Sequence, residues 1–185
     1  MSRDFDVAWK PDPIREARRQ MVDAMIEAGQ GAFSNPTVQR LSAHVGRLEQ
    51  ELCTSLTLGW LHLDQIVAAS AERDMLAVVD PVPQPDLGEF GIEGKFAFEG
   101  ARDERTPSAA KGAIFAWLAQ VPPVPGIARF KLLSGDWWCV IESECQSALA
   151  ALGDQPALDF GDWDGWDRWI RFLRVAADHG GFIVS

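Results

Sequence analysis

Apolar residues recur at helical spacing through the first third of the chain. Residues 12–28 carry them at every third or fourth position, and a short glycine-containing loop follows. Residues 36–52 hold a narrower seam with strict spacings of three and four, after Asn35 as a cap and Pro36 as the first helical residue. We therefore predict an antiparallel helical hairpin. Its second helix has the seam Val38, Leu41, Val45, Leu48 and Leu52.

The last third of the chain has the clearest helical pattern. It predicts a helix from about Trp163 to His179, ended by Gly180 and followed by a strand over residues 181–185. One face of this helix is apolar and is expected in the core. That face consists of Trp166, Trp169, Ile170, Leu173 and Ala177.

The segments between these helices are shorter and mix both periodicities. Residues 57–74 continue the helical pattern, with a break possible at Gly59, and residues 75–80 are typical of a short buried strand. Alternating runs predict β-hairpins over residues 89–100 and 127–141. Helices interleaved with antiparallel strands indicate an α+β protein, with the helical hairpin in front of a small, mostly antiparallel sheet packed with helices.

Proline-rich segments suggest where this chain is divided. The stretch "PVPQP" after Asp80 is stiff and extended, and it is the best candidate boundary. We expect a helical region over 1–80, an acidic linker and hairpin over 81–107, and an α+β region over 108–185, although the three can form one continuous domain.

Charge is concentrated in the middle of the chain. The net charge is −10, which disfavours binding to nucleic acid or to an anionic membrane. Residues 61–106 hold 4 basic and 10 acidic side chains, a net charge of −6. A basic partner protein would be attracted to this segment. The default alternative is a solvated acidic rim.

Tryptophan is frequent near the end of the chain, and two of these residues are adjacent. Trp137 and Trp138 stand in a predicted strand, where successive side chains point to opposite faces. The two tryptophan side chains therefore cannot both enter the same face of the core. The one that is exposed would be a natural anchor for a partner.

Candidate catalytic and metal-binding residues are isolated in the sequence. Cys145 falls in the first turn of a predicted helix, where the dipole lowers a thiol pKa, and His179 is a possible base. Neither has a partner fixed beside it by a motif. The stretch "DFGDWDGWD" resembles a calcium loop, but Phe160 and Arg171 occupy two required ligand positions. We therefore expect no metal and no cofactor, and interpret the aspartates as capping residues, with Asp162 or Asp164 as the cap.

These patterns favour a non-enzymatic protein that docks or neutralises a basic partner protein, as immunity proteins and antitoxins do. A small enzyme with dispersed Cys, His and acidic residues, and an assembly subunit that dimerises through residues 12–58, are the alternatives. The absence of a secretory pattern at the N-terminus predicts a cytoplasmic protein. The expected partner-binding residues are Asp86, Glu89, Glu93, Glu99, Asp103, Glu104, Trp137 and Trp138.

Overall fold

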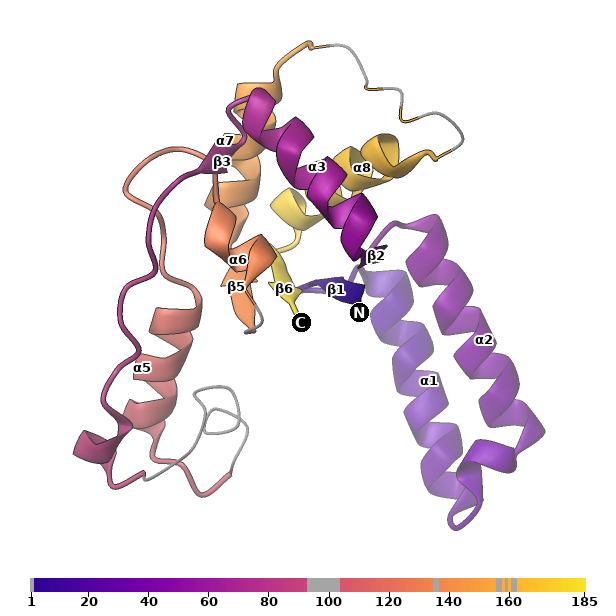
Figure 1. Cartoon of the computed structure of the whole chain (residues 1–185). Coiled ribbons are helices and arrows are strands. Elements are labelled where there is room, and N and C mark those ends of the chain that lie inside the picture. Colours follow the sequence, from indigo (N-terminus) through magenta and orange to yellow (C-terminus); the bar gives the residue numbers. More distant parts are fainter. Residues whose placement is uncertain (1, 93–103, 135–136, 156–157, 159, 161–162) are drawn as a thin grey trace.

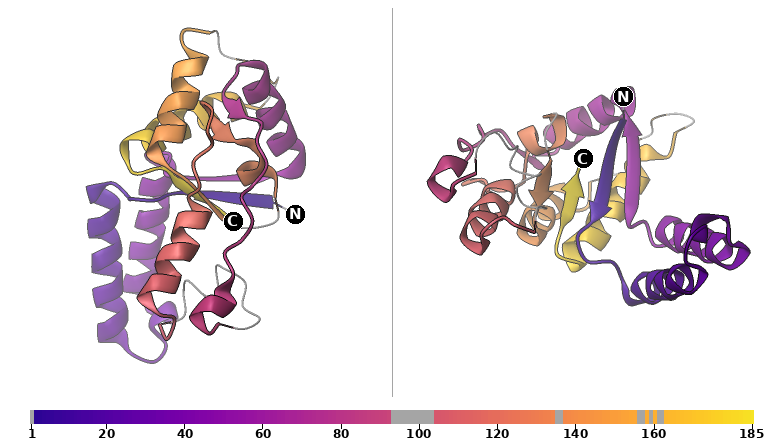
Figure 2. Two further views of the ribbon diagram at one scale, coloured as in Figure 1. Left: turned by 90° about the vertical axis from the view of Figure 1, so that its left-hand side faces the viewer. Right: turned by 90° about the horizontal axis from the view of Figure 1, so that it is seen from below.

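The computed structural model of the chain has the shape of an arch (Figure 1). Helices α3, α7 and α8 lie on one side of a four-stranded sheet, and two legs extend from the other side (Figure 2). One leg is the hairpin of α1 and α2, and the other is built around α5. The structure describes residues 2–92, 104–134, 137–155, 158, 160 and 163–185.

The sheet joins segments from the two ends of the described chain. Its order is β2-β1-β6-β5, and every neighbouring pair is antiparallel. Phe5 pairs with Leu56 on one side and with Val184 on the other. The strands are β1 (Ser2–Val7), β2 (Ser55–Gly59), β5 (Trp138–Val140) and β6 (Phe182–Val184).

Strand β1 shows how the sheet meets the core. Its side chains alternate, so that Phe5 and Val7 are buried while Asp4 and Asp6 are exposed. The Phe5 ring contacts the Trp169 ring of α8 edge to face, with centroids 5.9 Å apart. The main hydrophobic core therefore lies between the sheet and α8. The sequence analysis had assigned no strand to these residues.

The N-terminal helical hairpin is confirmed, as is the α+β class. Helix α1 (Asp12–Ala28) packs along α2 (Pro36–Glu51), and the Asn35 side chain accepts a hydrogen bond from the Thr37 amide at 2.9 Å. Of the predicted seam, Val38 and Val45 are buried. Leu41 and Leu48 are half-buried, and Leu52 lies beyond the helix and is exposed.

The final helix and the last strand are also confirmed. Helix α8 (Gly165–Asp178) buries all five residues of the predicted face. Asp164 stands at its N-cap but makes no side-chain capping bond, and Asp162 lies outside the described residues. Helix α7 (Glu142–Leu152) packs against α8.

Two predictions around the sheet are wrong. Residues 57–59 belong to β2 and not to a helix, because Leu56 and Leu58 alternate with more exposed neighbours and pair with β1. The break at Gly59 and the helix that follows it, α3 (Trp60–Glu72), are confirmed. Residues 127–141 form no hairpin. They contain β4 (Ile127–Ala128), α6 (Arg129–Leu133) and β5, and β5 pairs with the distant β6. Local alternation does not reveal a partner so far along the chain.

The remaining elements build the second leg of the arch. Strand β3 (Leu76–Ala77) confirms the predicted short buried strand and pairs in parallel with β4. The 3₁₀ helix η2 (Leu87–Phe90) occupies the start of the hairpin predicted over 89–100, so that start is wrong; residues 93–100 lie outside the described residues. Helix α5 (Ser108–Leu118) follows.

Candidate functional site

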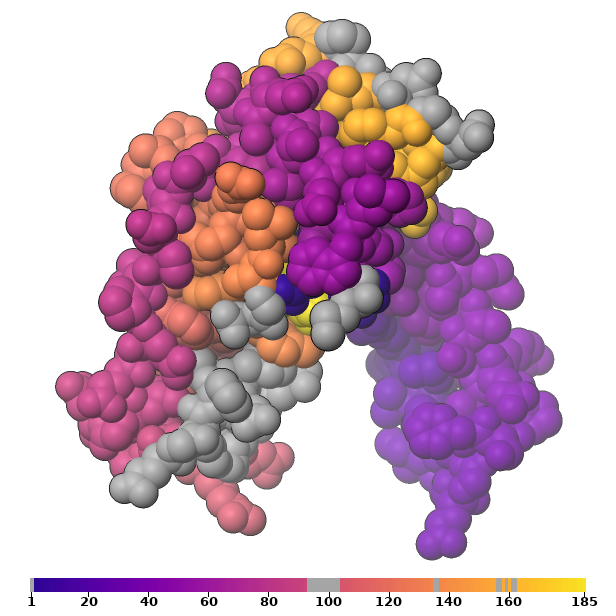
Figure 3. Space-filling model, in the orientation of Figure 1, coloured from indigo at the N-terminus to yellow at the C-terminus, as the bar shows by residue number. Residues whose placement is uncertain are grey.

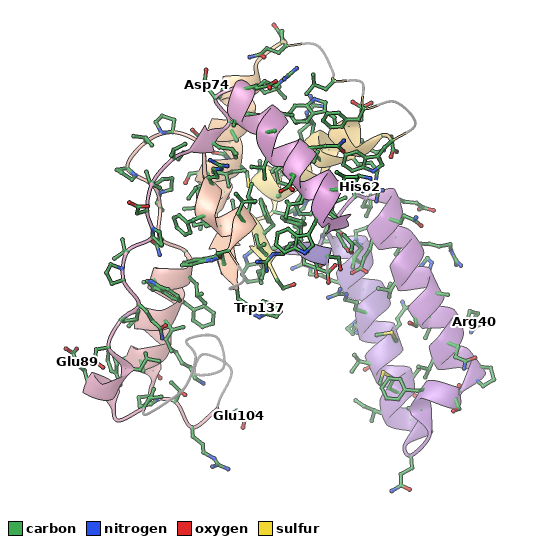
Figure 4. The ribbon with its side chains drawn as sticks, viewed as in Figure 1. Arg40, His62, Asp74, Glu89, Glu104 and Trp137 are labelled. Atoms are coloured by element: carbon green, nitrogen blue, oxygen red, sulfur yellow. The ribbon has the colours of Figure 1, made fainter. Side chains whose placement is uncertain are left out.

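The described part of the predicted acidic face lies at the far end of the α5 leg. Asp86, Glu89 and Glu104 are all exposed. Glu89 and Glu104 both lie near that end in Figure 4, whereas the acidic side chain of Asp74 lies at the opposite end of the molecule. The acidic segment therefore does not form one continuous face. Glu93, Glu99 and Asp103 lie outside the described residues.

A local hydrogen bond and a small apolar cluster hold the segment that carries Asp86 and Glu89 in place. The Asp86 carboxylate accepts a bond from the Gly88 amide at 2.8 Å, which starts η2. Leu87 packs with Ile114 and Leu118 of α5 in a hydrophobic cluster separate from the main core. These contacts fix η2, which follows Asp86 and contains Glu89, against α5.

The backbone of the extended segment before η2 forms hydrogen bonds with side chains in and just after α5. The Trp117 indole N–H donates to the Val82 carbonyl at 2.8 Å, and the Val82 amide donates to the Gln120 side chain at 2.6 Å. The side chain of Val82 itself remains exposed, as does that of Phe115, which is 52% exposed. This leg therefore presents large apolar side chains as well as carboxylates.

The two adjacent tryptophans divide as the strand geometry predicts. Trp138 is 3% exposed and its ring contacts those of Trp117 and Phe130, whereas Trp137 is 36% exposed. Trp138 is therefore a core residue and no partner anchor. Figure 4 places Trp137 below the sheet, between the two legs and apart from Glu89 and Glu104. The space-filling view leaves the region between the legs open (Figure 3).

Of the two predicted catalytic candidates, Cys145 has surroundings that oppose catalysis, and His179 lies at the end of α8. Cys145 is fully buried, and burial followed by the charge of Glu144 raises its thiol pKa to about 12. A thiol with that pKa stays protonated at neutral pH and is a poor nucleophile. The helix dipole emphasised in the sequence analysis is thus outweighed by desolvation. His179 caps α8, and its carbonyl accepts a hydrogen bond from the Trp9 amide.

A buried ion pair was not anticipated from the sequence. Lys131 of α6 donates to the Glu144 carboxylate at 2.7 Å, and both side chains are at most 1% exposed. The same carboxylate accepts from the Ile141 amide at 3.1 Å. Burial lowers the pKa of Lys131 from its ordinary value, against the opposing effect of Glu144. The pair joins α6, β5 and α7, and its position inside the fold marks it as structural.

Metal ligands and membrane spans can be judged only over the residues that the structure describes. Within them, no group of three or more His, Cys, Asp or Glu side chains is placed to hold a metal ion. In the same residues, no helix combines the length and apolar character needed to cross a bilayer.

Comparison with known proteins gives no further guidance on the site. We found no match to this chain among protein-family models, curated proteins or solved structures.

Proposed function

We propose that this protein is a non-enzymatic binding module that docks or neutralises a basic partner protein, in the manner of an immunity protein or antitoxin. The observation that carries the proposal is the surface of the α5 leg, which exposes both carboxylates and large apolar side chains. We name this surface the α5 face and define it by Val82, Asp86, Glu89, Glu104 and Phe115.

Electrostatics supports a basic partner. Within the described residues, none of Asp86, Glu89 and Glu104 forms an ion pair, so their charges are directed to solvent. Residues 81–106, which include these three carboxylates, hold 6 acidic and 3 basic side chains, a net charge of −3. Opposite charge on a partner raises the rate of encounter and excludes partners of like charge.

Apolar contact supports a docking role over a merely solvated rim. Phe115 and Val82 lie exposed on the leg that carries the carboxylates. Interfaces combine apolar residues, which lose their hydration on binding, with polar or charged neighbours at the rim. Trp137 lies apart from this face, so in this proposal it supplies a second contact only to a partner that also enters the space between the legs.

The test compares two charge reversals of equal size. The first replaces Asp86, Glu89 and Glu104 with Lys on the α5 face. The second, a matched control, replaces Asp23, Glu27 and Glu51 with Lys on the exposed surface of the helical hairpin. Each protein is used to capture partners from its native host, and the contacts are mapped by cross-linking and mass spectrometry.

The proposal expects a partner that cross-links to the α5 leg and binds both wild type and the hairpin variant. The α5-face variant should lose it, with slower association and a flatter dependence on salt. Equal association rates for wild type and the α5-face variant at low salt would reject the proposal.

A second candidate function rests on the tip of the helical hairpin. Ile26 and Phe33 are 73% and 79% exposed there, and Val22 is also exposed. Such a cluster favours self-association of residues 12–58 in an assembly subunit. The Ile26→Asp and Phe33→Asp exchanges should then convert a dimer to a monomer in light scattering. A wild-type monomer at high concentration would eliminate this candidate.

The proposed compartment is the cytoplasm. The support is the state of the cysteines, because Cys53, Cys139 and Cys145 are all free thiols in the structure. Thiols of this kind are typical of reducing compartments.

A further inference from the structure

A polar cavity lies where the end of α2 and the start of β2 meet the first turns of α8. Its volume is about 300 Å³, near the lower limit for small-molecule pockets. These three elements lie side by side in Figure 1, although α2 and α8 are far apart in sequence. The lining residues are Gln50, Cys53, Ser55, Asp164, Arg168 and Arg171.

The wall formed by α2 and β2 is held by an unusual turn. Cys53 adopts a left-handed backbone conformation with φ of 53°, which is uncommon for a residue with a side chain. Its thiol donates a hydrogen bond to the Arg168 carbonyl at 3.5 Å. The turn is thereby connected directly to the helix that carries the cavity's two arginines.

The opposite wall is also well supported. The Trp163 ring lies against Gly165, where an added Cβ would come within 2.0 Å of it. The same ring stacks on His62 of α3, with centroids 4.0 Å apart. These contacts fix the start of α8, and they place Arg168 and Arg171 one turn apart on a helix whose apolar face is buried.

The charges in the cavity favour an anion. Two guanidinium groups and one carboxylate give it a net charge of +1. Neither Arg168 nor Arg171 forms an ion pair with any residue that the structure describes. Burial raises the pKa of the Cys53 thiol despite both arginines, so this thiol is neutral at physiological pH and does not repel an anion.

We propose that this cavity binds a small phosphate monoester that carries hydroxyl groups. Guanidinium groups bind phosphate oxygens in a forked geometry, and Ser55 and Gln50 supply neutral donors for the remaining oxygens. The Asp164 carboxylate only accepts hydrogen bonds, so it would receive one from a ligand hydroxyl. This site is separate from the α5 face and does not depend on the proposed partner.

Glycerol 3-phosphate is a suitable probe, because it joins one phosphate to two hydroxyl groups. Calorimetric titrations would compare it with inorganic phosphate, sulfate and glycerol at equal ionic strength. We expect glycerol 3-phosphate to bind at least about tenfold more tightly than sulfate, and glycerol not to bind. Equal affinities for glycerol 3-phosphate and sulfate would overturn the proposal, as would no binding of glycerol 3-phosphate.

Two arginine variants on one helix test the location. Arg171→Gln removes a charge from the cavity, whereas Arg174→Gln removes the same charge from an exposed position of α8 outside it. We expect the first to weaken glycerol 3-phosphate binding about tenfold or more and the second to leave it unchanged. Equal losses in both variants would indicate nonspecific attraction and refute the assignment.

Alkylation of Cys53 provides a readout that does not rely on charge. This thiol lines the cavity, while Cys139 lies elsewhere. At an alkaline pH that ionises part of both thiols, saturating glycerol 3-phosphate should slow iodoacetamide modification of Cys53, measured by peptide mass spectrometry, and leave the rate at Cys139 unchanged. An unchanged rate at Cys53 under saturating ligand would place the ligand outside this cavity and contradict the proposal.

Discussion

Exchanging Glu144 for Gln tests the buried ion pair directly. The exchange keeps the shape of the side chain and removes its charge. In the native protein the Glu144 carboxylate receives hydrogen bonds from Lys131 Nζ at 2.7 Å and from the Ile141 and Ala128 amides at 3.1 and 3.3 Å. After Glu144→Gln, the Lys131 ammonium keeps the Cys139 carbonyl as a partner at 2.8 Å but has lost its counter-charge.

The expected cost follows from the burial of both groups. Breaking a buried ion pair by removing one partner costs about 3–5 kcal/mol, because the remaining charge is left uncompensated. For a chain of this size, each kcal/mol corresponds to roughly 2–4 °C in melting temperature. Glu144→Gln should therefore lower the midpoint by about 10 °C. Urea unfolding followed by tryptophan fluorescence would measure the free energy of unfolding.

Two further variants test whether the lost stability comes from the uncompensated charge of Lys131. Glu142→Gln changes an exposed carboxylate in the same first turn of α7 and should alter the free energy of unfolding by no more than about 0.5 kcal/mol. The double exchange Lys131→Met and Glu144→Gln removes both charges, and it should recover most of the lost stability. A natively folded Glu144→Gln variant that loses less than about 1 kcal/mol would refute the desolvated packing of α6 against α7.

Three other predictions concern the core and the hairpin. The raised pKa of Cys145, about 12 against 9.0 for an ordinary thiol, means that its stabilising contribution is complete below pH 9 and is lost as the pH rises toward 12. The difference in unfolding free energy between wild type and Cys145→Ala should therefore shrink above pH 9 in alkaline urea titrations, and a constant difference would disprove the shift. Val45→Asp should destabilise the protein by several kcal/mol in thermal unfolding because Val45 is buried, whereas His44→Asp at the neighbouring exposed position should have little effect; similar melting temperatures would contradict the α1–α2 packing. Trp138→Ala should cost about 3–5 kcal/mol in urea unfolding, and Trp137→Ala clearly less; the reverse order would mean that the two faces of β5 are misassigned.

Helical periodicity in the sequence correctly predicted those helices that bury one apolar face in the core. The spacing of Trp166, Trp169 and Leu173 predicted α8 because each of these side chains enters the same core. The seam around Val38 and Val45 predicted α2 for the same reason. In these helices the information needed for the assignment lies within about two turns of the chain.

Strands were harder to predict because their partners are distant. The alternation of Phe5 and Val7 with aspartates was a signal for β1, but it spans only a few residues. Leu56 and Leu58 belong to a run that leads directly into the helical pattern of residues 60–72, so their strand is recognised only when β1 is placed beside them. The cavity beside α8 was missed for a related reason: Arg168 and Arg171 look like ordinary polar residues of a helix until the turn at Cys53 is placed opposite them.

The position of β6 has a consequence for how the chain acquires its structure during synthesis. This strand lies between β1 and β5, so residues 182–184 complete a sheet that began with residues 2–7. Until the ribosome has released residue 184, β1 and β5 each keep an open edge able to pair with another chain. The hairpin of α1 and α2 relies on local contacts and can form early, whereas the sheet needs residues as far apart as 2 and 184. A chain that stops before Phe182 would thus contain a formed hairpin and two unpaired strand edges, a state prone to aggregation.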